Sequence, residues 1–270
     1  MDIPLSESLH SERFGSGRPL VLVHGLGSSW LNWTPVLTAL AAEREVIAID
    51  LPGHGRSPAL AGEVTVDTVT DAVQAFLSEN DLTTADLVGS SLGARIVLEL
   101  ARRGIGRHVV ALDPGGFWTS AERFAFAVSI GASVRLVRAI QRWLPALTRS
   151  RVGRLALFFQ FSAHPTRLDP ALLLAELRSF ALSPGLDPTF RALTHGPNQV
   201  GAWVTPGRVS IGWGHHDRVT VRAQAARARD KFHGSRLHWF ERSGHYPHWD
   251  QPQAAATFIL ESTGDAAPMP

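Results

Sequence analysis

The stretch Val88-Gly89-Ser90-Ser91-Leu92-Gly93-Ala94 decides the fold of this chain. It joins an apolar run typical of a buried strand to a segment with helical spacing, so it predicts a tight strand-to-helix turn centred on Ser91. The central residue of such a turn has strained backbone geometry, and its side chain projects out of the fold. A Cβ at Gly89 or Gly93 would collide across the turn. The Gly-x-Ser-x-Gly pattern therefore indicates a nucleophilic serine, although it also occurs by chance in loops of small residues.

Apolar runs and helical patterns alternate on both sides of this turn. Strands are expected at 20–23, 45–49, 85–90, 108–112, 208–211 and 236–240, with an edge strand at 6–14. Helices are expected at 33–42, 66–77, 92–103, 219–231 and 252–261. This alternation predicts an α/β fold, with a mostly parallel twisted sheet covered by helices on both faces.

The alternation stops after Asp113-Pro114-Gly115-Gly116 and resumes near residue 208. Between about 120 and 192 the periodicity is helical, with interruptions at Pro145, Pro165 and Pro184, which predicts three or four inserted helices. The inserted segment holds ten Arg and four acidic residues, whereas the remainder has 16 basic and 20 acidic residues. We therefore expect three parts, namely a first core part at 1–117, a helical cap or lid at 118–200 and a second core part at 201–270.

A serine hydroxyl is a poor nucleophile at neutral pH, so it needs a base that is itself oriented by an acid. Two loops after late strands carry candidates, with Asp217 in one and His245 in the other. Loops at the carboxyl ends of parallel strands meet at one edge of the sheet, where sites in open α/β folds lie. The order Ser91, Asp217, His245 is the Ser…Asp…His order of such folds. Asp113, which also follows a strand, is the alternative acid.

Five stretches in this order make the chain resemble the α/β-hydrolase superfamily over nearly its whole length: 24–27 (His-Gly-Leu-Gly), 50–57, 89–93, 214–217, and 244–245 followed by 249–252 (Trp-Asp-Gln-Pro). The resemblance implies an α/β-hydrolase fold in which the inserted helices form a cap. It implies that Ser91 is the nucleophile, His245 the base and Asp217 the acid. It also implies that the backbone N–H groups of Leu26 and Leu92 form the oxyanion hole, where one donor is worth about 10²–10³ in rate.

These residues predict a cofactor-independent serine hydrolase that cleaves a carboxylic ester, thioester or lactone through an acyl-enzyme. One alternative is hydrolysis of a C–C bond in a vinylogous diketone, as in ring-cleavage hydrolases of similar architecture. Ser90 argues against it, because those enzymes typically have Asn before the nucleophile. Another alternative is a ligand receptor without turnover, against which the complete triad argues. Epoxide and haloalkane chemistry in this superfamily needs an Asp nucleophile, which position 91 lacks.

The inserted segment is rich in Phe and Trp, most of which we expect to pack its helices onto the core. Since the cap of this family lies over the cleft, a few should line it, which favours a substrate with a substantial apolar part. The expected substrate-binding residues are Trp118, Phe158, Phe159 and, beside the predicted base, Tyr246. Arg135, Arg138 and Arg142 fall on one helical stripe, which we expect to be a solvated face. An anionic partner or a membrane surface is the alternative.

Composition excludes several other classes of function. The chain has 270 residues, no Cys and a net charge of +2, with 44% hydrophobic and 19% charged residues. Absence of Cys excludes disulfides, a Cys nucleophile and thiolate metal sites, and we expect neither a metal nor a cofactor. No run of about 18 apolar residues and no signal peptide is visible, so we expect no membrane insertion and a cytoplasmic protein. The expected partner is a small molecule rather than nucleic acid, and the oligomeric state stays open.

Overall fold

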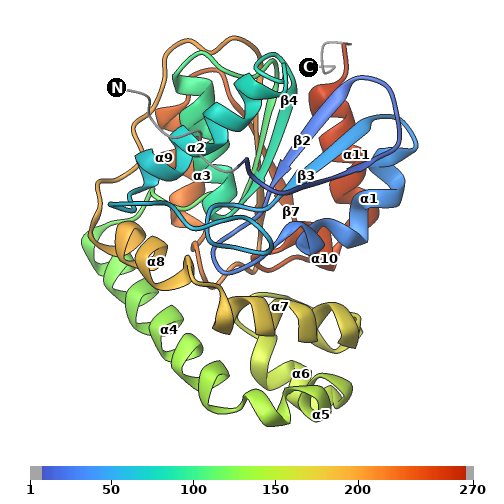
Figure 1. The fold of residues 1–270 in the computed structure, drawn as a ribbon, viewed down its shortest axis with the longest axis vertical. Coiled ribbons are helices and arrows are strands. Elements are labelled where there is room, and N and C mark those ends of the chain that lie inside the picture. Colours follow the sequence, from blue (N-terminus) through green and yellow to red (C-terminus); the bar gives the residue numbers. More distant parts are fainter. Residues whose placement is uncertain (1–7, 266–270) are drawn as a thin grey trace.

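The computed structural model describes residues 8–265 and contains a seven-stranded sheet in the order β1-β3-β2-β4-β5-β6-β7 (Figure 1). The strands are β1 (Ser11–Phe14), β2 (Pro19–Val23), β3 (Glu45–Ile49), β4 (Asp86–Ser90), β5 (Val109–Leu112), β6 (Val209–Gly214) and β7 (Arg236–Phe240). Only β1 pairs antiparallel, on β3, and all other pairings are parallel. The predicted mostly parallel sheet is confirmed. The edge strand begins later than expected, at Ser11, and residues 6 and 7 of the expected strand lie outside the described residues.

Helices cover both faces of the sheet (Figure 1). They are α1 (Thr34–Ala41) after the 3₁₀ turn η1 (Trp30–Trp33), α2 (Val66–Glu79), α3 (Leu92–Arg102), α9 (Ala223–Lys231), α10 (Pro247–Asp250) and α11 (Pro252–Thr263). Side chains alternate across each strand, so Leu20 and Leu22 of β2 pack with α1 and α11. Val21 and Val23 pack with α2, α3 and α9 on the opposite face. The two apolar cores hold the sheet between two helical layers.

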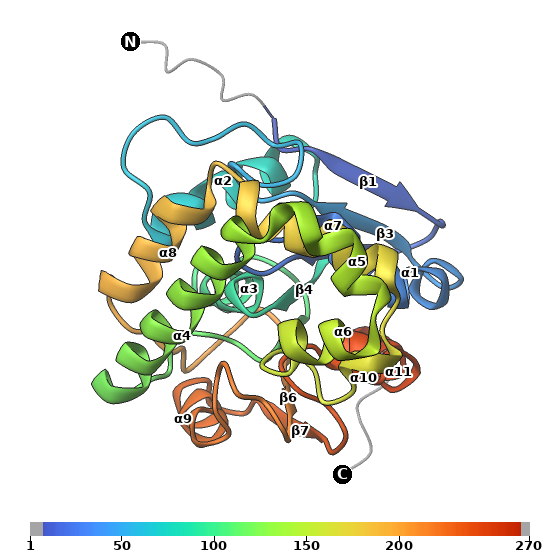
Figure 2. The same ribbon diagram turned by 90° about the horizontal axis from the view of Figure 1, so that it is seen from below.

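A helical segment separates β5 from β6 and lies beyond one end of the sheet (Figures 1 and 2). Its elements are α4 (Ser120–Ala139), η2 (Gln141–Trp143), α5 (Leu144–Arg149), α6 (Arg151–Phe158), η3 (Pro165–Arg167), α7 (Pro170–Leu182) and α8 (Leu186–His195). The structure therefore has five α-helices where three or four were predicted. Ser150 ends α5 and caps α6 with its own side chain, which accepts a hydrogen bond from Gly153 N. A break this short leaves the apolar periodicity intact, which is why the sequence did not reveal it.

The helical segment is fastened over loops that follow β2 and β3. A Cβ at Gly27 would lie 2.6 Å from Phe180 Cδ2 of α7, so helix and loop approach closely because this residue is glycine. Ser179 Oγ donates to Ser28 O at 3.0 Å, and Gly185 N donates to Gly53 O at 2.8 Å. These contacts place α7 over the carboxyl ends of the strands.

Helix α4 exposes several large apolar side chains. Phe124, Val128 and Leu136 are exposed there. Arg138 pairs with Asp187 of α8 at 3.0 Å, so this part of the predicted Arg stripe binds a neighbouring helix. Within residues 8–265 no single helix is long and apolar enough to cross a membrane, although α4 and the segment 141–149, bent by 70°, meet the length and composition requirement together.

Candidate active site

Ser91 lies at the turn between β4 and α3, with φ 55° and ψ −111°. Few non-glycine residues adopt a positive φ, and such strain is concentrated at functional sites. A Cβ at Gly89 would lie 2.2 Å from Gly93 O, and a Cβ at Gly93 would lie 2.0 Å from Val23 O. The turn therefore requires glycine on both sides of the serine, for the steric reason predicted from the sequence.

Backbone N–H groups surround the serine. Ser91 is half-buried between the buried residues Ser90 and Leu92. Leu92 is the first residue of α3, so its N–H has no acceptor within the helix. A Cβ at Gly25 would lie 3.2 Å from Ser91 Cβ, which brings the Gly25–Leu26 peptide beside the serine. No acceptor within residues 8–265 takes the Leu26 N–H. Both predicted oxyanion donors are thus available next to Ser91.

His245 and Asp217 are joined by a hydrogen bond of 2.8 Å between Nδ1 and Oδ2. The carboxylate is held in place, because its Oδ1 accepts from Val219 N at 2.7 Å and Thr220 N at 3.0 Å, and its Oδ2 also accepts from Thr220 Oγ1 at 2.6 Å. The imidazole Nδ1–H therefore donates to Asp217, which leaves Nε2 as the free base. Ser91 Oγ takes part in no hydrogen bond within residues 8–265, and catalytic hydrogen bonds often form only when substrate binds.

Asp113, the alternative acid, lies in the same cluster. Ligand atoms of Asp113, Asp217 and His245 all lie within 4.8 Å of one another, a spacing that could also hold a metal ion. Asp113 Oδ1 accepts from Gly214 N at 2.8 Å, whereas Oδ2 has no partner within residues 8–265. The structure thus brings both candidate acids to His245, but only Asp217 forms a hydrogen bond with it.

The two carboxyl groups have opposite pKa shifts. Burial and the neighbouring negative charge of Asp217 raise the pKa of Asp113 well above its usual value. Burial acts on Asp217 in the same direction, but the charge of His245 and hydrogen bonds from His245 and Thr220 outweigh it and lower the pKa of Asp217. Asp217 is therefore the carboxyl group that ionises more readily, and Asp113 is the one that retains its proton more strongly.

A small apolar cavity of about 40 Å³ lies between the loop after β2, the loop of His245 and the helical segment. It is lined by Leu26, Gly27, Ser133, Val137, Leu157, Phe158, Phe161, Glu176, Leu177, Phe180, Tyr246 and Trp249. Two of the four residues expected to bind substrate, Phe158 and Tyr246, line it. Trp118 is buried against Phe126 instead, and Phe159 is 54% exposed, so the structure brings neither into this cavity.

A buried polar network runs along one wall of the cavity. Glu176 Oε2 accepts from Ser28 Oγ at 2.7 Å and from Asn32 Nδ2 at 3.2 Å. Asn32 Oδ1 in turn accepts from His248 Nε2 at 2.7 Å. Burial raises the pKa of Glu176 to about 7. The network links α7 to the loop that carries Leu26, and sequence reasoning missed it.

The raised pKa of Glu176 predicts a pH-dependent stability difference between the wild type and Glu176→Gln. The ordinary pKa is 4.5 and the folded value about 7, so between these pH values the folded chain holds a proton that the unfolded chain releases. Wild-type stability should therefore fall relative to the variant as pH rises from 4.5 to 7, by roughly 3 kcal/mol in total at about 1.4 kcal/mol per pKa unit. Urea unfolding of both proteins across this range measures the difference.

The comparison with the variant is needed because buried histidines titrate with the opposite sign. Burial lowers the pKa of His24 and His54 to about 4 and of His248 to about 3, so each favours the folded state more as pH rises. These residues are common to both proteins and cancel in the difference. Parallel stability curves for the wild type and Glu176→Gln would contradict the raised pKa.

Other residues of the predicted motifs hold the loops in place. His24 Nε2 accepts from Leu51 N at 2.9 Å, so its Nδ1 carries the proton and donates to Gly25 O. His24 therefore holds the loop after β2 against the loop after β3. Asp250 was missed as an organising residue, since its Oδ2 accepts from Gly244 N and from Ala163 N, both at 2.8 Å. Asp250 thereby joins the loop of His245 to the helical segment.

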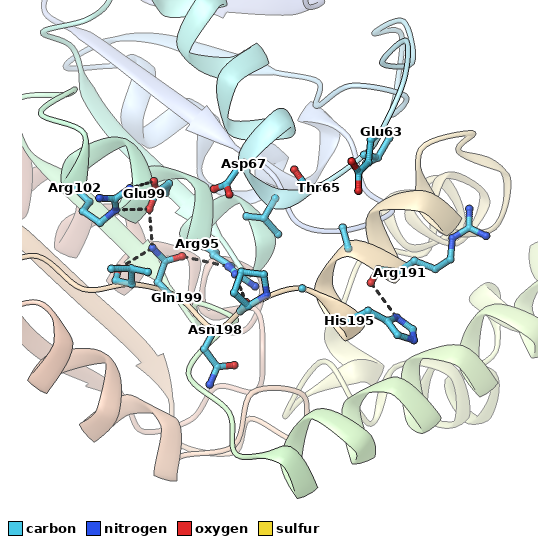
Figure 3. Close-up of a pocket in the computed structure, with 16 residues that line it drawn as sticks. Glu63, Thr65, Asp67, Arg95, Glu99, Arg102, Arg191, His195, Asn198 and Gln199 are labelled. Atoms are coloured by element: carbon cyan, nitrogen blue, oxygen red, sulfur yellow. Dashed lines mark hydrogen bonds and ion pairs between the residues drawn. The ribbon is translucent and has the colours of Figure 1, made fainter.

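A second hollow lies away from these residues, between α2, α3 and α8 (Figure 3). Charged and polar side chains form part of its wall, and Figure 3 shows Gln199 joined to both Arg95 and Glu99. Glu99 is also paired with Arg102. None of the predicted site residues lines the hollow.

The sheet order, the strained turn at Ser91 and the Asp217–His245 pair agree with the expected fold family, and the family comparison shows it. The model of the alpha/beta hydrolase family matches residues 20–258, so the chain belongs to that family.

Curated relatives differ in how much of the chain they match. A 2-hydroxymuconate semialdehyde hydrolase from Pseudomonas sp. (strain CF600) is 29% identical over 263 residues, 90% of this chain and 85% of that protein. A dihydrolipoyllysine-residue acetyltransferase component of an acetoin cleaving system from Pseudomonas putida is 46% identical over 85 residues, which are 32% of this chain and 23% of that protein.

Among solved structures, a thermophilic esterase from Thermogutta terrifontis superimposes with a TM-score of 0.73. The match covers 94% of this chain and 92% of that one, at 20% identity. This likeness confirms the predicted fold.

Proposed function

We propose that this protein is a serine hydrolase that cleaves a carboxylic ester, thioester or lactone with an apolar portion. The observation that carries the proposal is the Asp217–His245 hydrogen bond. The strained turn at Ser91 supports it, as does an apolar cavity lined by Leu26, which follows a glycine close to Ser91, and by Tyr246, which follows His245. The helical segment acts in this proposal as the cap that covers the site.

In the proposed mechanism, Ser91 Oγ attacks the carbonyl carbon while its proton passes to His245 Nε2. The negative charge that develops on the carbonyl oxygen is stabilised by the N–H groups of Leu26 and Leu92. His245 then gives the proton to the leaving group, and Asp217 stabilises the imidazolium in the meantime. Water deprotonated by His245 hydrolyses the acyl-enzyme, which releases the acid and restores Ser91. Each step uses groups of the chain itself.

Cleavage of a C–C bond is the second candidate, and the muconate semialdehyde hydrolase favours it because it matches most of the chain. The cavity argues against it. The name of that relative's substrate denotes a carboxylate, whereas the residues that line this cavity include Glu176 and no Arg, Lys or His. A carboxylate in an apolar pocket with a Glu and no cation would be strongly disfavoured. A neutral ester fits this lining better than a substrate that carries a carboxylate.

The test is a substrate panel of p-nitrophenyl esters, acyl thioesters, lactones and a vinylogous diketone, assayed on wild type and Ser91→Ala. The proposal expects turnover of at least one of the first three classes and its loss in the variant. Turnover of the diketone alone would establish the second candidate instead. Failure of every class in a folded wild-type protein would overturn the proposal.

The position of two neighbouring aromatic residues predicts which one sets the acyl-chain preference. Phe158 lines the cavity, whereas Phe159 points to solvent. Phe158→Ala should therefore change the ratio of kcat/KM between long and short p-nitrophenyl esters by roughly tenfold or more, because each methylene in an apolar pocket is worth about 1–3 kcal/mol. Phe159→Ala is the matched control and should leave the length profile unchanged. If Phe158→Ala leaves the length profile as unchanged as Phe159→Ala does, the acyl chain does not lie against Phe158.

A further inference from the structure

The strongest unexplained feature is the second oxygen of the Glu176 carboxyl. Glu176 lines the cavity, whereas Ser28 and Asn32, which hold its Oε2, do not. Oε1 is buried and has no hydrogen-bond partner within residues 8–265. Glu176 as a residue is only 7% exposed. A buried carboxyl oxygen without a partner costs free energy comparable to a lost hydrogen bond, which a suitable ligand would recover.

Glu176 lines the same cavity as residues next to the proposed reacting groups. Glu176 shares the cavity with Leu26, whose N–H faces the proposed oxyanion, and with Tyr246, which follows the proposed base. Ligand pockets of this kind combine an apolar lining with a few polar groups that set orientation. Among the described residues that line the cavity, Glu176 and Tyr246 are the only ionisable ones.

We propose that Glu176 Oε1 is a specificity-determining group that binds a neutral hydroxyl on the part of the substrate held in the cavity. The inference rests on the proposed function and adds to it a substrate class, namely esters, thioesters or lactones that carry an alcohol or enol on an otherwise apolar chain.

A hydroxyl fits this oxygen better than other polar groups do. Burial raises the pKa of Glu176 to about 7, so near neutral pH both protonation states are populated. A hydroxyl donates to the ionised form and accepts from the protonated form, so it suits both. A substrate carboxylate would be repelled by the ionised form, and no cation lines the cavity to offset that repulsion. An ammonium would have to be desolvated in an apolar pocket.

The test compares p-nitrophenyl hexanoate with its analogues hydroxylated at carbon 3, 4, 5 or 6. We expect wild type to prefer one hydroxylated ester by about 10- to 100-fold in kcat/KM, the range for a hydrogen bond to a charged group. Glu176→Leu should abolish this preference, so that the hydroxylated and the plain ester are turned over with similar kcat/KM. Glu176→Gln, which keeps an acceptor for Ser28 and Asn32, should weaken it several-fold and serves if the Leu variant does not fold.

Ser28→Ala is the matched control, because Ser28 contacts only the other carboxyl oxygen. It should lower stability and keep the preference for the hydroxylated ester. If no position of the hydroxyl is preferred by more than about twofold, or if Ser28→Ala loses the preference as fully as Glu176→Leu, the inference is overturned and Glu176 only fastens α7 to its loop.

A binding experiment separates this inference from the proposed function. Hydroxylated and plain alkyl methyl ketones can be titrated into Ser91→Ala by calorimetry, which needs no turnover. Tighter binding of one hydroxylated ketone, lost in the Ser91→Ala/Glu176→Leu double variant, supports the hydroxyl subsite even if no ester is hydrolysed. Equal binding of hydroxylated and plain ketones overturns it, whatever the outcome of the substrate panel.

Discussion

Ser91→Ala should lower kcat for the best ester by about 10⁶ while KM changes little, the size of effect expected when the nucleophile of such a triad is removed. The variant keeps the N–H groups of Leu26 and Leu92 and the cavity. Binding and a residual rate above that of water should therefore survive. Steady-state kinetics, with circular dichroism to verify the fold, measures the effect.

The neighbouring serine supplies the control. Ser90 is fully buried, and its Oγ has no partner within residues 8–265, so Ser90→Ala removes a hydroxyl without breaking a hydrogen bond. Activity should stay near the wild-type level. A fluorophosphonate should label Ser91 in wild type and in Ser90→Ala, as read by peptide mass spectrometry. Labelling at Ser90, or loss of activity in Ser90→Ala but not in Ser91→Ala, would show that the nucleophile is Ser90 and not Ser91.

The sheet could be predicted well from the sequence, because its strands are short apolar runs ended by glycine-rich loops. Residues 45–49 and 236–240 form β3 and β7 with the expected bounds. Parallel strands that are buried on both faces form continuous apolar runs, so their bounds can be predicted from the sequence. The order of Ser91, Asp217 and His245 along the chain was equally informative, since the carboxyl ends of parallel strands must meet at one edge.

The helical segment was harder to predict, since helical periodicity states neither where helices break nor which face meets the core. Phe158 and Phe159 are adjacent, and successive helix positions point about 100° apart, so the sequence could not show which one lines the cavity. Glu176 contacts Ser28 and Asn32 across 148 and 144 residues, a pairing that no local pattern reveals. Its signal was a lone carboxylate among the apolar residues Leu172, Leu173 and Leu177.

Asp217→Asn should lower kcat by about 10⁴, the cost known for the triad acid of serine proteases. Asp217 Oδ2 accepts the Nδ1–H of His245 at 2.8 Å and so fixes the imidazole tautomer. An amide at this position removes the charge that stabilises the imidazolium and allows the wrong tautomer. A pH profile of kcat/KM, recorded with the ester preferred by wild type, should show the loss at every pH.

Asp113→Asn should cost less than about tenfold, because its raised pKa makes the folded residue a neutral acid that an amide imitates. The Asn oxygen can still accept from Gly214 N, as Asp113 Oδ1 does at 2.8 Å. If Asp113→Asn costs more than Asp217→Asn, the acid of the triad is the residue after β5, and the role assigned to Asp217 is wrong.

The double variant Asp113→Asn/Asp217→Asn tests the coupling between the two carboxyl groups. In Asp217→Asn the neighbouring negative charge is gone, so the pKa of Asp113 should fall and the residue can ionise within 4.8 Å of the ligand atoms of His245. Part of the activity lost with Asp217 would then be recovered by Asp113. We therefore expect the double variant to be at least tenfold slower than Asp217→Asn, although Asp113→Asn alone is nearly silent. Equal rates for Asp217→Asn and the double variant would show that Asp113 cannot serve His245, and that its closeness to the triad is structural.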